Sequence, residues 1–324
     1  MSAPERLDEL KTVAIVQSIG SSTRIEGSTL SDTEVANLIQ GLGKQDFSSR
    51  DEEEVAGYAD SLAEIYRSWE HIPLTENHIR QLHGMTLKHS SKDQRHRGEY
   101  KKTPNNVVAT DAKGKVAGVV FATATPFETP GRMKALVAQT QVELESKEQH
   151  PLLVIGNFIV HFLAIHPFQD GNGRISRILT NLMLLRQGYA YVPYSSLEHV
   201  VETNKAAYYL ALRATQKTLG TPKEDLNPWL LFFLRSLKAQ KDHLRDLIQE
   251  AGKIAPLDKL DSAILKAVEK HGNLGLTALV DLTGGKKDTL KVRLTKLVKT
   301  GRLERNGKGP ATFYRLAAPG GPGA

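Results

Sequence analysis

Apolar residues recur every three or four positions through most of the first 250 residues, a spacing typical of amphipathic helices. Thr75 is an expected helix N-cap, Pro151 stands where a helix would start, and Gly188 stands where one would end. The pattern predicts helices over residues 7–19 (followed by a turn at 20–22), 52–70, 76–85, 131–147, 152–165 and 175–187. We therefore expect a mainly α fold.

One segment, Asn105–Phe121, departs from the helical pattern. The apolar, largely β-branched runs Val107–Thr110 and Val116–Phe121 flank Asp111–Gly114. The glycine suits the positive φ that a hairpin turn requires. This segment predicts a short β-hairpin.

The two most apolar of the predicted helices, 152–165 and 175–187, enclose a short polar loop, His166–Arg174. Both helices carry wide apolar stripes, so we expect them at the centre of a domain. A polar loop held between two core helices is where a functional site is expected.

Composition narrows the class of protein. The 324 residues are 40% hydrophobic and 24% charged, as in ordinary globular proteins, and can form two or three cores. The absence of cysteine excludes disulfides, thiolate zinc sites and cysteine nucleophiles. No signal peptide is visible, and no apolar run approaches the ~20 residues of a membrane span, so we expect a cytoplasmic protein with no membrane partner.

Positive charge is concentrated near the C-terminal end. Residues 251–324 hold 14 Lys and Arg against 6 Asp and Glu, a net charge of +8, whereas residues 1–250 carry −1. The asymmetry predicts a domain boundary near residue 250. A tail rich in proline and glycine, expected to be flexible, follows from residue 319.

Residues 258–316 resemble a winged helix-turn-helix module. We expect helices over 260–268, 276–282 and 288–299, and a two-stranded wing over 301–316. The third helix has a basic face made of Lys287, Lys291, Arg293 and Lys296. Such modules place this helix in the DNA major groove, which makes DNA a candidate partner. Protein docking or dimerisation is the competing interpretation, because a charged face is often only solvated.

The loop after residue 166 has the features of an anion site. Gly171 and Gly173 flank Asn172, a spacing that lets successive backbone N–H groups point into one concavity. The next helix starts here, and its positive end also favours an anion. Arg174 and Arg177 lie on one face of its first turn, where two cations are unfavourable unless an anion binds. Forked guanidinium groups bind phosphate oxygens in pairs, so a polyphosphate is the expected ligand.

Two further side chains complete the predicted chemistry. His166 titrates near neutrality and can act as a general base. Asp170 can hold Mg²⁺, which commonly binds one or two carboxylates together with substrate phosphates. An ordinary glycine-rich connection is the simpler interpretation, but it does not explain a base, a carboxylate and two arginines in one loop. The motifs G-x-x-x-x-G-K-[ST], H-E-x-x-H and G-x-S-x-G do not occur.

The run His166–Arg177, with the sequence HPFQDGNGRISR, resembles the signature of Fic domains, H-P-F-x-[DE]-G-N-G-R-x-x-R, without departure. A weaker resemblance extends over residues 10–250. The family has a helical fold, and most members transfer AMP from ATP to Ser, Thr or Tyr of a target protein. The resemblance therefore implies an adenylyltransferase that uses ATP and Mg²⁺.

The resemblance also implies roles for individual residues. His166 would be the base on the target hydroxyl, and Asp170 the Mg²⁺ ligand. Asn172 and the nest of Gly171 and Gly173 would hold the α- and β-phosphates, and the two arginines, Arg174 and Arg177, the terminal ones. A related kinase-like branch has Lys in place of Gly173, so glycine favours AMP transfer over phosphate transfer.

A second motif lies near the N-terminus. Ser22–Gly27, with the sequence STRIEG, resembles the inhibitory motif of the family, [ST]-x-x-x-E-[GN]. The resemblance implies that Glu26 pairs with Arg177 and holds ATP unproductively, as in the N-terminally inhibited subclass. In some relatives this glutamate supports removal of AMP, so a reverse activity is a further expectation. An ordinary i, i+4 pair of Ser22 and Glu26 is the alternative interpretation.

The resemblance assigns two more regions. The hairpin 105–121 would be the flap that aligns the target segment by strand addition, although a plain surface hairpin is the alternative. Tyr209 and Gln216 are at positions where relatives contact the nucleoside, but Tyr208 and Tyr209 are equally suited to a core. The remaining histidines, His83 among them, show no metal-ligand spacing and are interpreted as packing or surface residues.

The predicted organisation is a helical region with the inhibitory motif (1–75), a Fic catalytic domain (76–250), a winged helix-turn-helix domain (251–318) and a tail (319–324). The favoured hypothesis is an autoinhibited AMP transferase, because His166 beside the phosphates has no purpose in a sensor. The alternative is a DNA-binding regulator whose Fic-like domain only senses nucleotide. The target protein, the acceptor residue, the balance of addition and removal, and homodimerisation are left open.

Overall fold

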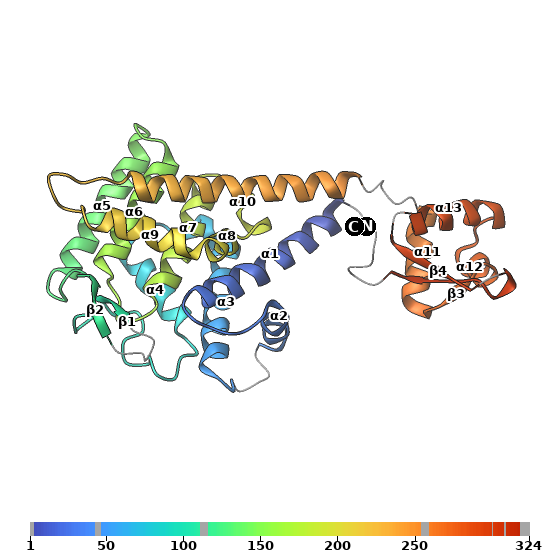
Figure 1. Ribbon diagram of the computed structural model, residues 1–324, viewed down its shortest axis with the longest axis horizontal. Coiled ribbons are helices and arrows are strands. Elements are labelled where there is room, and N and C mark those ends of the chain that lie inside the picture. Colours follow the sequence, from blue (N-terminus) through green and yellow to red (C-terminus); the bar gives the residue numbers. More distant parts are fainter. Residues whose placement is uncertain are drawn as a thin grey trace. The chain divides into compact units, whose positions relative to one another are not determined.

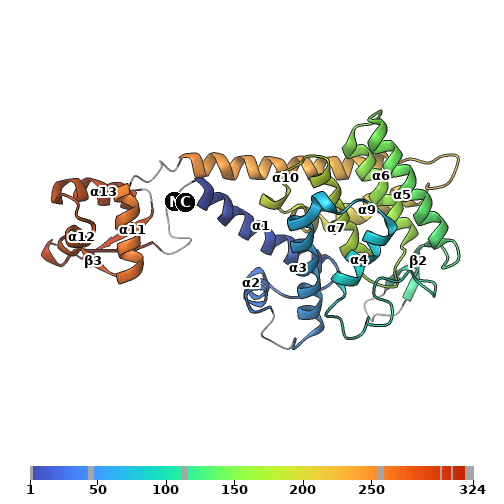
Figure 2. The same cartoon turned by 180° about the vertical axis from the view of Figure 1, so that it is seen from behind.

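The structure is a computed structural model that describes residues 3–42, 47–110, 116–253, 259–299, 301–307 and 309–317. These residues form two compact units. The larger comprises Glu9–Arg245, and the smaller contains the helices and strands between Lys259 and Leu316. Figures 1 and 2 show each unit from two sides. The turn predicted at Asp111–Gly114 and the tail predicted from residue 319 lie outside the described residues.

The N-terminal part of the larger unit is helical. Its elements are α1 (Ala3–Ile25), α2 (Asp32–Gly41), α3 (Arg50–Ser68), a 3-10 turn (Trp69–His71) and α4 (Glu76–Thr86). The hydroxyl of Thr75 accepts a hydrogen bond from the backbone N–H of His78, which confirms the predicted N-cap of α4.

The turn predicted at residues 20–22 is wrong, because α1 continues to Ile25. Ser21, Ser22 and Thr23 are buried, and in this helix their hydroxyls find partners in Arg24, Arg177 and helix carbonyls. The hydroxyl of Thr23, for example, donates to the carbonyls of Ile19 and Gly20, at 3.1 and 3.0 Å. Tertiary burial therefore overrides the turn preference of this glycine–serine sequence.

The core of the larger unit surrounds two helices, α6 (Pro151–Ile165) and α7 (Asn172–Arg186). Helix α7 lies at the centre, in contact with α3, α4 and α6 (Figures 1 and 2). It starts three residues before the predicted start at 175, because Gly171 is its N-cap with a φ of 77°. Asn172 and Arg174 therefore lie in the first turn of a buried helix.

The hairpin and the remaining helices of this unit frame the same core. Strands β1 (Val107–Thr110) and β2 (Val116–Phe121) pair antiparallel, which confirms the predicted hairpin. Other elements are α5 (Thr129–Ser146), a 3-10 turn (Val192–Tyr194), α8 (Leu197–Thr203), α9 (Lys205–Gln216) and α10 (Asn227–Lys253). The hairpin lies at the edge of the unit in both views, and β2 contacts α9 (Figures 1 and 2).

The smaller unit has its own hydrophobic core. It contains α11 (Lys259–His271), β3 (Leu274–Gly275), α12 (Leu276–Thr283), α13 (Lys287–Lys299), β4 (Leu303–Asn306), a 3-10 turn (Gly309–Ala311) and β5 (Phe313–Leu316). The strands form a small antiparallel sheet in the order β3–β5–β4. The third strand, β3, is not part of the predicted wing, and it pairs with β5 through Leu274 and Gly275.

None of the helices in the described parts of the chain has the length and apolarity needed to cross a lipid bilayer.

Candidate active site

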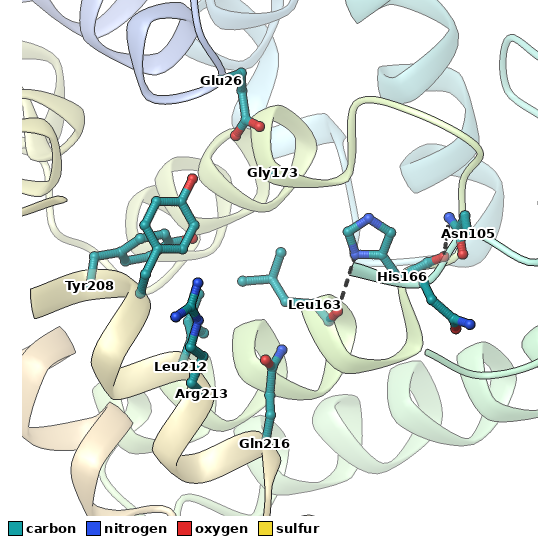
Figure 3. Close-up of a pocket in the computed structure, with 11 residues that line it drawn as sticks. Glu26, Asn105, Leu163, His166, Gly173, Tyr208, Leu212, Arg213 and Gln216 are labelled. Atoms are coloured by element: carbon teal, nitrogen blue, oxygen red, sulfur yellow. Dashed lines mark hydrogen bonds between the residues drawn. The ribbon is translucent and has the colours of Figure 1, made fainter. Parts of the chain in front are cut away.

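His166 follows the last residue of α6 and has a left-handed backbone, with a φ of 54°. Its N–H donates to the carbonyl of Phe162 at 2.9 Å. The ring Nδ1 lies 3.3 Å from the carbonyl oxygen of Leu163 (Figure 3). A carbonyl only accepts, so Nδ1 carries the proton and Nε2 keeps its lone pair.

The surroundings of His166 keep the ring neutral. The expected titration of His166 near neutrality is wrong, because burial lowers its pKa to about 4, with a smaller lowering by the ammonium of Lys101. The contact with Leu163 and the carboxylate of Glu26 act in the opposite direction. At pH 7 the ring is therefore a proton acceptor at Nε2.

Asn172 closes the loop between α6 and α7. Its side-chain oxygen accepts from the N–H of Phe168 at 2.9 Å, and its side-chain nitrogen donates to the carbonyl of Phe168 at 2.7 Å. Both bonds are buried. The amide of Asn172 is thus used within the loop. The N–H of Gly171 donates to the carboxylate of Asp170 at 2.7 Å, so the predicted nest is left with the N–H groups of Asn172 and Gly173.

His83 supports the same loop from α4. Its ring stacks on Phe168 with a centroid distance of 3.7 Å. Nδ1 accepts from the N–H of Gly98, so Nε2 carries the proton and donates to the carbonyl of Asp170, each at 3.0 Å. His83 is fully buried, so its interpretation as a packing residue is confirmed.

The burial of His83 predicts a pH-dependent stability. Burial lowers the pKa of His83 from 6.5 to about 4. Between these values the unfolded chain binds a proton that the folded protein does not, so stability falls as the pH drops from 6.5 toward 4. We expect His83 to account for a loss of roughly 3 kcal/mol in the free energy of unfolding over this range.

Urea unfolding of the parent and His83→Gln at several pH values checks this expectation. The difference in unfolding free energy between the two proteins should be largest near pH 7 and should shrink toward pH 4. A difference that stays constant over this range would show that the imidazole does not titrate with a lowered pKa.

A cluster of four charged residues joins the loop to α3. Arg50 bonds Glu54 at 2.7 Å and lies 3.3 Å from a carboxylate oxygen of Asp170. Arg174 lies 3.3 Å from Glu54 and 3.6 Å from the same oxygen of Asp170. Arg174 is only 2% exposed. Its Nη1 makes the contact with Glu54, and its Nε has no hydrogen-bond partner among the described residues. A buried guanidinium with an unused donor is suited to bind an anion.

The carboxylate of Asp170 has the exposure that a metal ligand needs. Its side chain is 40% exposed, so water and a ligand can reach it. In the described parts of the chain, no three or more His, Asp or Glu side chains are grouped so that they could hold a metal ion by themselves. One carboxylate, completed by phosphate oxygens and water, agrees with the usual binding of Mg²⁺ in nucleotide sites.

Glu26 contacts Arg177, the second arginine of the predicted phosphate site, in the first part of α7. Its carboxylate is 2.8 Å from Nη2 of Arg177, so the expected contact between these residues is present. Arg177 also donates to the hydroxyl and carbonyl of Ser22, at 2.8 and 2.9 Å. Although burial alone would lower it, the carboxylate raises the pKa of Arg177 above its ordinary value. The predicted motif residues Ser22 and Glu26 thus both bind the arginine that is expected to bind phosphate.

Gly173 makes room for this carboxylate. A Cβ atom at residue 173 would overlap the carboxylate of Glu26. Figure 3 shows Glu26 pointing toward the first turn of α7 at Gly173. Gly27, the last residue of the motif, has a φ of 112° and ends the helical path after α1. The Glu26 carboxylate therefore occupies the start of α7, where the helix end favours an anion.

A second ion pair attaches the last turn of α1 to α8. Arg24 binds both carboxylate oxygens of Glu202, at 2.6 and 3.1 Å. It also contacts Asp32 at 2.9 Å. Because Arg24 lies two residues before Glu26, this attachment helps to hold Glu26 over Arg177.

A cavity of about 440 Å³ brings together five of the predicted site residues, Glu26, His166, Gly173, Tyr209 and Gln216, whereas Asp170, Arg174 and Arg177 do not line it. It is lined by Glu26, Asn105, Asn106, Leu163, His166, Gly173, Tyr208, Tyr209, Leu212, Arg213 and Gln216. Figure 3 shows Tyr208, Arg213 and Gln216 on one helix, α9, facing the cavity that His166 lines. Volumes of this order accommodate small organic ligands.

The structure separates the two adjacent tyrosines of α9. Tyr208 is 5% exposed and packs edge-on against Trp229, as a core residue does. Tyr209 is 36% exposed. Arg213, which the sequence analysis did not select, lies four residues after Tyr209 and three before Gln216. Helical spacing from these two residues was the available signal.

Residues 73–184 match the model of the Fic/DOC family. This range contains the whole segment His166–Arg177, the hairpin and α4 to α6. This part of the chain is therefore similar to Fic/DOC family domains. Glu26 and the cavity residues of α9 lie outside the matched range.

The chain is a distant homologue of protein adenylyltransferase Fic. The protein of that name from Drosophila melanogaster is 29% identical over 188 residues, which cover 56% of this chain and 35% of the relative. The one from Aedes aegypti is 28% identical over 184 residues, which cover 54% and 33%. The chain thus spans about a third of the length of the curated relatives that it matches.

Solved structures show the same fold. A Fic family protein from Desulfovibrio desulfuricans has a TM-score of 0.69 over 96% of this chain and 89% of that chain, at 22% identity. A Fic domain-containing signaling protein from Bacteroides thetaiotaomicron has a TM-score of 0.61 over 79% and 94%, at 28% identity. The larger unit therefore has a mainly helical, Fic-type fold.

Proposed function

We propose that this protein transfers AMP from ATP to a Ser, Thr or Tyr hydroxyl of a target protein and that Glu26 inhibits the transfer. One observation carries the proposal. A neutral histidine with a free Nε2 shares a cavity with the anion-binding start of α7, and a carboxylate already occupies that start.

The expected reaction assigns a task to each group. With ATP phosphates at the start of α7, Nε2 of His166 would take the proton of the target hydroxyl. The hydroxyl oxygen forms a bond to the α-phosphorus, the bond from this phosphorus to the bridging oxygen breaks, and pyrophosphate leaves. Transfer of this kind depends mostly on positioning and charge neutralisation, which Arg174 and Arg177 can supply.

Asp170 is the residue that would hold Mg²⁺. When bound, the ion would neutralise phosphate charge. Because Arg50 lies 3.3 Å from the Asp170 carboxylate, binding at that oxygen requires Arg50 to withdraw. Arg50 is half-exposed, so it can do so without opening the core.

Inhibition follows from the contacts of Glu26. Its carboxylate accepts a hydrogen bond from Nη2 of Arg177 and fills the space beside Gly173. A terminal phosphate that needs the same donor must displace it. We infer that ATP binds weakly, or with its α-phosphorus away from the target hydroxyl, until the last turn of α1 moves. The same glutamate could orient water for AMP removal, the reverse activity.

Two neighbouring elements would receive the rest of the substrates. Tyr209 and Gln216 line the cavity and are suited to contact the nucleoside, together with Arg213. The hairpin β1–β2 lies beside the site through Asn105 and Asn106, and we propose that it aligns the target segment by strand addition.

The alternative of a DNA-binding regulator depends on the smaller unit. Two of the four basic residues expected to face DNA, Arg293 and Lys296, each lie 3.4 Å from the buried carboxylate of Asp261. A third, Lys291, lies 3.1 Å from Asp288. These pairs lower the charge available for phosphate contacts, so DNA binding is the less favoured of the two functions.

The position of a label in ATP tests the proposal. The Glu26→Gly protein is incubated with cell lysate and Mg²⁺, once with the label on the α-phosphorus and once on the γ-phosphorus. AMP transfer predicts labelled protein only in the first case, and His166→Ala in the same background should remove the label. Label from the γ-phosphorus would indicate phosphate transfer, and no label in either case would contradict the proposal.

A further inference from the structure

Two residues, Lys101 and Asn105, together bind four consecutive backbone carbonyls around His166, and Asn172 also donates to the last of them. Lys101 binds the carbonyl of Ile165 through Nζ at 3.0 Å and that of Pro167 through its backbone N–H at 2.8 Å. The side-chain nitrogen of Asn105 donates to the carbonyls of His166 and Phe168, at 3.2 and 2.5 Å. The segment that carries the expected base is thus bound along its whole length.

The ammonium of Lys101 is buried and fully used. The residue is 3% exposed, and Nζ donates to Ile165, to the side-chain oxygen of Asn105 at 2.7 Å and to the hydroxyl of Thr123 at 2.9 Å. These three acceptors match its three protons. Burial lowers the pKa of Lys101 to about 8, so the charge remains at pH 7. Burying a charge is costly, and a surface lysine would not need this arrangement.

The bound segment is one that needs support. His166 has φ and ψ of 54° and 59°, a left-handed conformation that is unfavourable for a side chain with a Cβ. Its ring orientation depends on the long Nδ1 contact with Leu163, at 3.3 Å. Rotation of the peptide planes at 165–168 would move both the ring and that contact.

The same residues also hold the base of the hairpin. Asn105 and Asn106 precede β1, and Thr123 follows β2. The hydroxyl of Thr123 donates to the side-chain oxygen of Asn105, and its N–H donates to that of Asn106, both at 3.1 Å. The two ends of the hairpin therefore meet at the bonds that hold the His166 segment.

We propose that Lys101 and Asn105 are positioning residues that fix the orientation of the His166 ring and couple it to the base of the hairpin. We call this pair the carbonyl clamp. Neither residue takes a proton from substrate, and their contribution to transfer rests on the proposed function. Their effect on the orientation and tautomer of the His166 imidazole does not depend on that function.

The test of the carbonyl clamp compares two neighbouring lysines. Lys101→Met has a similar size but loses the ammonium, whereas Lys102→Met is the matched control because Lys102 is exposed. In the Glu26→Gly protein we expect Lys101→Met to lower the transfer rate at saturating ATP by about 100-fold, the effect of displacing a catalytic group. The affinity for ATP, measured by calorimetry, should stay within about twofold, as should the rate of Lys102→Met.

A second readout needs no activity. Nuclear magnetic resonance of isotope-labelled histidine reports which ring nitrogen carries the proton, and His166→Ala identifies the signal. We expect a single Nδ1–H tautomer in the parent and in Lys102→Met, and a mixture of tautomers in Lys101→Met. If Lys101→Met does not fold, Asn105→Ala, which removes the donors to residues 166 and 168, takes its place.

The outcomes separate the two proposals. A folded variant of the clamp that keeps both the tautomer and the rate of Lys102→Met would overturn the inference. If the Glu26→Gly parent transfers no AMP, the proposed function fails, and the tautomer measurement alone decides the role of the clamp.

Discussion

Glu26→Gly is expected to raise AMP transfer by about 10- to 100-fold, because a hydrogen bond between charged groups contributes roughly 1.5–3 kcal/mol and each 1.4 kcal/mol is about tenfold. The substitution removes the carboxylate that lies 2.8 Å from Nη2 of Arg177. It also empties the space beside Gly173. Arg177 keeps its two bonds to Ser22 and so remains in place for a terminal phosphate.

Initial rates with ATP labelled on the α-phosphorus, together with calorimetry of ATP binding, measure this effect. Glu26→Gln is the control, since it keeps the size of the side chain and removes its charge. A rate between those of the parent and Glu26→Gly would show that charge and volume both contribute. Calorimetry that detects no ATP binding to Glu26→Gly would contradict the whole assignment of the phosphate site.

His166→Ala in the Glu26→Gly background is expected to lower AMP transfer by about 10²- to 10⁴-fold, the usual contribution of a general base. The free Nε2 of a neutral ring is the group on this wall of the cavity that can accept the proton of a hydroxyl at pH 7. Affinity for ATP should change little, because the expected phosphate contacts come from α7 and its arginines.

His161→Ala is the matched control for this substitution. His161 is on α6, five residues before His166, and its Nδ1 bonds the carbonyl of Asn157. It does not line the cavity that His166 lines. Equal rates for the His166→Ala and His161→Ala proteins would mean that another group removes the proton.

The central part of this fold was readable from sequence because its signals are local. Helices α6 and α7 are apolar on most sides, and the hairpin is flanked by β-branched runs. The exact start of α7 was not readable from apolar periodicity. It depends on Gly171, whose positive φ allows the helix to begin at Asn172, three residues before the first apolar position.

Contacts between distant segments were predictable only where a motif implied them. The Glu26–Arg177 contact followed from the resemblance to the inhibitory motif. Lys101 and Asn105 lie more than 60 residues before the carbonyls that they bind, and no periodicity connects them. A lysine in a loop, here followed by a second lysine, is expected at the surface, so the burial of Lys101 could be found only from the structure.

Tyr208 and Tyr209 show a third limit of prediction from the sequence. Their sequence positions were equally suited to a core and to a ligand contact. Adjacent residues on a helix point about 100° apart, so the two rings differ in burial, although both line the cavity. The packing of Trp229 against Tyr208 settles which of the two is buried.

The absence of a side chain at residue 173 makes regulation and turnover inseparable at that position. One small volume admits either the carboxylate of Glu26 or a phosphate, so any larger residue there disturbs the resting and the working protein together. Under the proposed function, the threshold for activation can change without a change at the site itself where Arg24 and Glu202 attach α1 to α8. Substitutions at those two residues would change how often Glu26 leaves Arg177. They would leave the rate of the transfer step in the open site unchanged.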